Sequence, residues 1–250
     1  MTENNNLNLE LKLLRGCPIE IQNVGKIHPV TIDDILDITL EKYNQHLNVL
    51  CIESEDIKKF LDITDEIQTY EFLYINCVQS KEYKNIVLDA LTFFFREEVR
   101  FSELYGFYLG EIEEKRVINN ENFEEVKYVI KKLNCIASKE DEEEKYNPAN
   151  ERARKILEKL KKDKATRERI KQKENEENML SLFDLISILA AYGNNLNIFN
   201  IWDLTFFQFN NQFNRMKILK DYEVNIQILM NTTEPDKVKY QHWLSKIVKE

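Results

Sequence analysis

Apolar side chains recur every three or four residues over most of this chain, a spacing that predicts helices rather than strands. Few turns interrupt the pattern, since the 250 residues include only five Gly and four Pro. The expected helices cover residues 7–15, 32–52, 55–63, 66–78, 82–95, 121–135, 179–192 and 236–248.

Short polar side chains mark where some of these helices begin. Thr31 is the expected N-cap of the helix at 32–52, with Asp33 and Asp34 in the first turn, where carboxylates meet the positive end of the helix dipole. Further expected caps are Ser54 and Asn120 at N-termini, and Gly16 and Gly193 at C-termini.

Two short stretches have the character of antiparallel strands. In the first, Ile19, Ile21 and Ile27 flank a turn at Gly25, which predicts a hairpin. In the second, residues 96–118, β-prone runs are broken at two glycines, which predicts a small antiparallel meander. We therefore expect a mainly α protein of the α+β class.

Six aromatic side chains gather within NIFNIWDLTFFQFNNQFNRMKIL, residues 197–219. Thr205 and Gln208 fit a capping box, with Leu204 and Phe209 at the positions of a hydrophobic staple. Apolar side chains then follow the spacing of one helix face at Phe206, Phe209, Phe213 and Met216. Most of these aromatic residues are therefore expected in the core.

Trp202 and Phe207 do not fall on that face. Trp202 precedes the expected cap, and Phe207 points about 100° away from Phe206 around a helix of 3.6 residues per turn. Either side chain can pack against the preceding helix, or can stay exposed as an aromatic anchor for a partner. Both readings stay open at this point.

Composition indicates a cytoplasmic protein. The net charge is −9, no apolar run reaches the roughly 18 residues of a membrane span, and the N-terminus lacks the basic and apolar regions of a secretory signal. The four cysteines stand singly, without a CxxC pair, and are expected to be reduced and buried. We expect no membrane association.

The composition changes most sharply at residues 138–178, which predict a charged helical arm between an N-terminal α+β domain at 1–137 and a C-terminal helical domain at 179–250. Residues 151–173 contain eleven Lys or Arg and four acidic residues. Lys159, Lys161 and Lys162 are therefore candidate contacts to a partner. Acidic runs flank this segment and no recognition fold surrounds it, so nucleic acid is not the expected partner.

Catalytic chemistry has little support. The sequence has no nucleophile elbow, no glycine-rich dinucleotide or P-loop motif and no HExxH. His28 lies beside Pro29 in the hairpin and is expected to be structural. We expect no catalytic residues, no metal site and no cofactor.

Several stretches resemble phage and prophage proteins of Gram-positive, low-GC hosts. They are GKIHPVTIDDILDI, KYNQHLNVLCI, YNPANERARKILEKLKK, LISILAAYGNNLNIFNIWDLTFFQFNNQFNRM and HWLSKI. The chain looks like a tail assembly chaperone, although many members of that group are shorter. The resemblance implies a non-enzymatic protein that binds the tape-measure protein, the tail-tube protein or both.

Two alternatives stay open: a structural component of the tail or connector that remains in the virion, and a nucleic-acid-associated phage protein that uses the basic arm. A homo-oligomer also stays open.

Overall fold

The computed structural model describes residues 3–61, 68–111, 116–136, 180–193 and 195–233, together with 238, 240–245 and 247. The protein is mainly helical with two small antiparallel sheets, as predicted. Residues 1–136 and 199–250 form one compact unit, and residues 137–198 form another. The predicted arm at 138–178, with Lys159, Lys161 and Lys162, lies outside the described residues.

The chain begins with helix α1, Glu3–Arg15, which packs on the long helix α11, Phe206–Asn231. Gly16 ends α1 with a φ of 75°, a conformation that a side chain would strain. A Cβ at this position would also lie 3.2 Å from the Thr205 methyl group, so this close approach of α1 to the start of α11 favours glycine.

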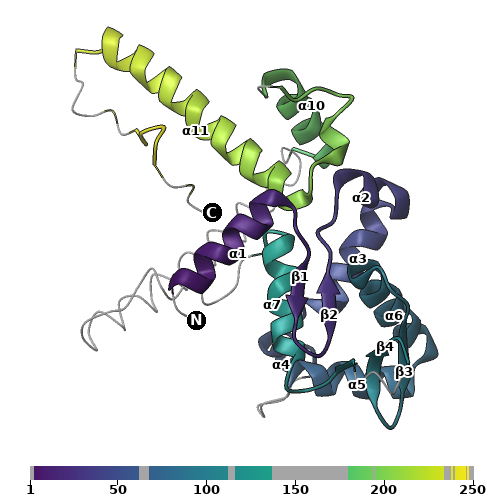
Figure 1. Cartoon of the computed structure of the whole chain (residues 1–250). Coiled ribbons are helices and arrows are strands. Elements are labelled where there is room, and N and C mark those ends of the chain that lie inside the picture. Colours follow the sequence, from purple (N-terminus) through teal and green to yellow (C-terminus); the bar gives the residue numbers. More distant parts are fainter. Residues whose placement is uncertain are drawn as a thin grey trace, which may run out of the picture. The chain divides into compact units, whose positions relative to one another are not determined.

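The predicted hairpin and meander are both present (Figure 1). Strands β1, Ile19–Ile21, and β2, Gly25–Ile27, pair so that Ile19 lies opposite Ile27, with both side chains buried. The meander has the order β3-β4-β5 and consists of β3 (Val99–Ser102), β4 (Gly106–Leu109) and β5 (Val117–Ile118). Alternation along β1 and β2 therefore directs isoleucines into the core.

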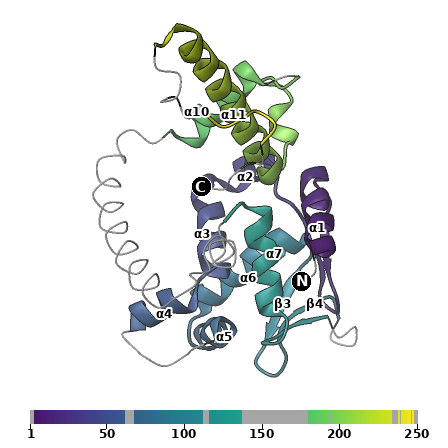
Figure 2. The same cartoon turned by 90° about the vertical axis from the view of Figure 1, so that its left-hand side faces the viewer.

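Five further helices make up most of the core, and Figure 2 shows them together with strands β3 and β4 of the meander. They are α3 (Leu40–Leu50), α4 (Ser54–Leu61), α5 (Thr69–Gln79), α6 (Lys81–Phe95) and α7 (Phe123–Leu133). Helix α6 packs on both α3 and α5, and α7 contacts the hairpin. The largest fully buried side chains include Tyr43, Phe94, Phe95 and Phe123.

The helix predicted at 32–52 is two helices, α2 (Ile32–Ile38) and α3. Thr39 separates them with φ 75° and ψ 146°, and its hydroxyl accepts a hydrogen bond from the Lys42 backbone N–H at 3.4 Å. A β-branched residue rarely adopts a positive φ. The apolar spacing continues across this break, which is why the pattern predicted a single helix.

Two predicted caps are wrong by one or two residues. Ser54 is the first residue of α4, and the Glu53 carbonyl accepts the backbone N–H of Ile57 at 3.1 Å. At the start of α7 the N-cap is Asn122 rather than Asn120. The expectation of buried cysteines is also wrong in part, because Cys77 is buried, Cys17 and Cys51 are half-buried, and Cys135 is exposed; none of the four is in a disulfide.

Thr31 and Thr205 join the two ends of this unit. Each is the N-cap of a helix with a complete capping box, closed by Asp34 in α2 and by Gln208 in α11. The two threonines also pair as an isolated antiparallel bridge. Around this bridge, the Phe206 N–H donates to the Val30 carbonyl at 2.7 Å, and the Ile32 N–H donates to the Leu204 carbonyl at 3.0 Å.

A buried ionic network lies between α4, α5 and α7. Lys127 and Lys131, whose side chains are 7% and 5% exposed, both pair with Glu53, Lys127 at 3.7 Å. Lys127 also pairs with Glu124 at 2.6 Å, and Thr69 donates a hydrogen bond to the same carboxylate. Two ammonium groups are therefore held inside the fold by carboxylates, without which their burial would be costly.

His46 on α3 is buried without a hydrogen bond to either ring nitrogen. Its ring lies 5.5 Å from the Phe93 ring of α6. Burial lowers the pKa of His46 below 6.5, nearby Lys42 lowers it further, and Asp89 opposes the shift. The folded protein therefore keeps this imidazole neutral at pH values where an exposed one would be protonated.

We expect Thr205→Ala to lower the free energy of unfolding by about 1 kcal/mol, because the α11 capping box is lost. Thr205→Ser keeps the hydroxyl and should retain most of that stability. Urea unfolding followed by circular dichroism measures both variants. Equal stabilities for the Ala and Ser variants would contradict the capping role.

We expect Lys131→Met to lower the free energy of unfolding by about 3 kcal/mol, because it removes one of the ammonium groups that balance the part-buried Glu53 carboxylate. Lys42→Met is the matched control, since it breaks the exposed Lys42–Asp89 pair, and should cost at most about 1 kcal/mol. The same urea titration compares them. A cost as small as that of the control would show that the network does not stabilise the fold.

The pH dependence of stability should change in His46→Leu. In the wild type the unfolded chain binds a proton near pH 6.5 while the folded protein binds it only at lower pH. The free energy of unfolding therefore falls as pH drops below about 6.5. His46→Leu should show a smaller fall between pH 6.5 and 5 in thermal or urea unfolding. Parallel pH curves for the two proteins would contradict this assignment.

Candidate partner-binding surface

The two aromatic residues predicted to contact a partner lie close together in sequence, around the start of α11. Trp202 is in the short helix η2, Ile201–Asp203, and Phe207 is in the first turn of α11. Both side chains are half-buried. Their role in binding stays a prediction, as does that of the arm lysines 159, 161 and 162, which lie outside the described residues.

The apolar stripe of α11 begins as predicted. Phe209 is buried, and Phe206, Phe213 and Met216 are half-buried. The rings of Phe209 and Phe213 stack 6.5 Å apart. This end of the helix contacts α1 and α7. Of the six aromatic residues in this stretch, Phe209 is buried, four are half-buried and Phe199 is 89% exposed, so the expectation that most of them lie in the core is wrong.

Beyond Met216 the stripe moves to another side of the helix. Two successive steps of three residues shift it by about 120° around a helix of 3.6 residues per turn. The half-buried apolar positions of the second half are Leu219, Tyr222, Ile226 and Leu229. One helix therefore presents two apolar faces, the first toward the core and the second away from it.

The C-terminal segment lies against the second face. The predicted helix at 236–248 is wrong for its described residues 240–245, which contain a turn at 242–245 and no helix. The ring of Tyr222 lies 5.9 Å from that of Tyr240 and 5.3 Å from that of His242. Arg215 donates hydrogen bonds to two carbonyls of this turn.

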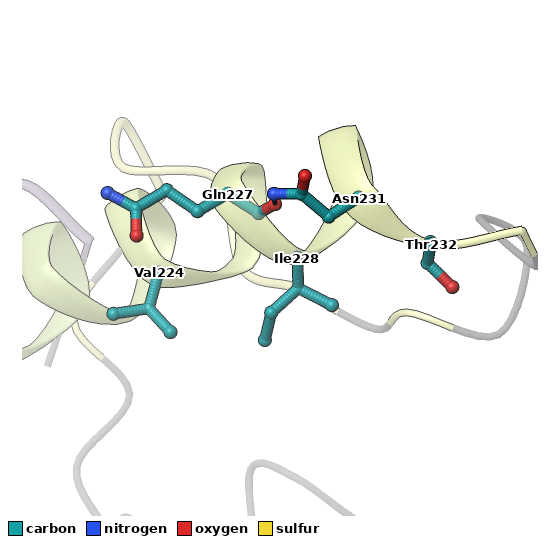
Figure 3. A pocket seen from close by; sticks show the side chains of 5 residues that line it. All are labelled: Val224, Gln227, Ile228, Asn231 and Thr232. Carbon is teal, nitrogen blue, oxygen red and sulfur yellow. Dashed lines mark hydrogen bonds between the residues drawn. The ribbon is translucent and has the colours of Figure 1, made fainter.

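A shallow groove lies near the C-terminus of α11, on the side opposite to the second apolar face. It is lined by Val224, Gln227, Ile228, Asn231 and Thr232. In Figure 3 the side chains of Val224 and Ile228 point the same way, one turn apart, with amide groups beside them. Val224 is 53% exposed and Ile228 46%, so two neighbouring branched side chains face solvent here.

Helix α10, Leu182–Tyr192, belongs to the other unit and is almost entirely apolar. Ser181 caps it with a box closed by Asp184, and Gly193 ends it, as predicted. Phe183 and Tyr192 are 77% and 65% exposed. A helix that is apolar on most sides usually has a binding partner, so α10 is a second candidate surface.

Helix α1 carries a third exposed stripe. Leu7, Leu11 and Leu14 are spaced as neighbours on one helix face, and each is about half-exposed. Leu13 points to another side and is buried. Helices α1 and α11 thus both expose aliphatic side chains.

The described residues offer little chemistry beyond these surfaces. Within them, no cluster of three His, Cys, Asp or Glu side chains could hold a metal ion. His28 is half-buried, its backbone N–H donates to the Phe94 carbonyl at 2.8 Å, and burial followed by Arg96 lowers its pKa. Burial raises the pKa of the Cys51 and Cys77 thiols to about 12, which makes them poor nucleophiles.

No helix in the described parts of the chain combines the length and apolar character that a membrane crossing requires.

Comparison with known proteins gives a match to a protein family. Neither the curated proteins nor the solved structures gave a match. Residues 171–248 match the family described as the second domain of YomV, a Bacillus phage or prophage protein. The match covers 78 of the 250 residues and includes α10, η2 and α11. The C-terminal third of the chain is thus similar to a domain of a phage or prophage protein.

Proposed function

We propose that the protein assists phage tail assembly without catalysing a reaction, as a chaperone that binds the tape-measure protein, the tail-tube protein or both. The observation that carries this proposal is the exposure of apolar side chains on α10 and α11, within the region similar to a phage protein domain. A folded monomer gains nothing from leaving Phe183, Val224 and Ile228 in water, whereas a binding surface requires such residues.

The kind of client follows from the shape of these surfaces. Each is the side of a helix rather than an enclosed pocket, and the groove at Val224 and Ile228 is shallow. Apolar side chains one turn apart fit the face of an amphipathic helix. A long helical client such as a tape-measure protein presents that face many times over, and the resemblance described above points to the same client.

Capture from cells tests the proposal. A tagged wild-type chain should retain the tape-measure or tail-tube protein from phage-producing cells, as identified by mass spectrometry. Val224→Asp with Ile228→Asp should weaken capture about tenfold or more, because charges then replace the apolar contacts. Asp221→Asn, an exposed change on the same helix, is the control and should capture normally.

Purified particles decide between the chaperone and a virion component. A chaperone should be absent from finished particles. A fixed copy number in particles would instead identify a structural component of the tail or connector. Failure of the wild-type chain to retain any tail protein would overturn the assembly role.

A further inference from the structure

The described C-terminal turn is built to meet α11. The His242 carbonyl accepts the backbone N–H of Ser245 at 2.9 Å, and the His242 Nδ1 accepts the backbone N–H of Leu244 at 3.2 Å. This turn directs two backbone carbonyls toward α11. The Arg215 Nη1 donates to the Trp243 carbonyl at 3.1 Å and to the Ser245 carbonyl at 2.9 Å.

Tyr222 provides a second anchor two helical turns further along α11. Its ring contacts the Tyr240 ring, and it meets the His242 ring edge-on. Arg215 and Tyr222 are seven residues apart and therefore lie on one side of the helix. That side also carries the half-buried Leu219, Ile226 and Leu229. The chain's own C-terminal segment thus occupies part of the second apolar face.

This segment is only weakly packed against α11. Tyr240, Trp243 and Leu244 remain 48%, 42% and 69% exposed, so the turn buries little of its own apolar surface. Its residues also have a different local preference, because Tyr240, Trp243, Leu244 and Ile247 follow the spacing of one helix face. The sequence of this segment is therefore compatible with a second, helical arrangement.

We propose that residues 240–245 form a displaceable strap over the Arg215–Tyr222 face of α11, and that a helical partner competes with the strap for this face. In the free protein the occupant is the strap itself. The competition rests on the proposed function, with this face as a second contact for the client in addition to the groove at Val224 and Ile228, whereas the strap does not. Occupation lowers the apparent affinity for the partner by the fraction of molecules in which the face is open.

Trp243 reports the strap directly, because the chain has only one other tryptophan, Trp202. In a full-length Trp202→Phe background, we expect Arg215→Ala to increase acrylamide quenching of Trp243 and to shift its emission to longer wavelengths. Tyr240→Ala with His242→Ala should have the same effect from the strap side. Arg100→Ala, which removes a half-exposed guanidinium from β3, is the control and should leave the emission unchanged.

Exposure of the apolar face can be measured with the dye 1-anilinonaphthalene-8-sulfonate, which fluoresces when it binds apolar surface. Its fluorescence should rise when the strap is released by Tyr240→Ala with His242→Ala, a pair that leaves α11 intact. Leu244→Ala changes an exposed side chain of the same turn and should not raise it. Unchanged quenching and unchanged dye fluorescence in the paired variant would overturn the strap.

Competition is read from capture of the tape-measure or tail-tube protein in the assay described above. The paired variant should capture more than the wild type, because the face is open in more molecules. Released strap with unchanged or reduced capture would overturn the competition. If the wild type and the paired variant both capture nothing, the proposed function and the competition fail together, while the dye and the quenching still decide whether the strap exists.

Discussion

The pairing of Thr31 with Thr205 holds the larger unit together. Each threonine starts a helix, and the four backbone groups beside them exchange two hydrogen bonds. The start of α2, and with it the hairpin before it, is thereby tied to the start of α11. Gly16 packs against the same place, so α1 is held there as well. Loss of this contact would separate the aromatic stripe of α11 from the core that it covers.

Local features of this arrangement could be predicted from the sequence, and distant ones could not. The capping boxes at Thr31 and Thr205, the hairpin and the meander each depend on residues a few positions apart. The bridge between the two caps joins segments about 170 residues apart, and the sequence of neither segment indicates that it pairs with the other. The break at Thr39 was also hidden, because its apolar spacing continues and threonine rarely adopts that backbone conformation.

Charge and exposure were predicted least well. The sequence did not predict that Lys127 and Lys131 are buried against Glu53. Their spacing of four residues beside Val126 and Ile130 is the one sign that could have placed them on the inner face. On α11 the first apolar stripe was predicted, but its shift past Met216 was not, and the C-terminal turn lies on the shifted part.

The long separation of Thr31 and Thr205 also affects how the protein is made. During synthesis the hairpin and α2 leave the ribosome well before residue 206. At roughly 5–20 residues per second the intervening chain takes on the order of ten seconds or more. For that time the inner sides of α1 and α2 lack their partner, and closing so long a loop is slow. The newborn N-terminal part is therefore a half-finished unit that is open to association with other chains until its own C-terminal third arrives.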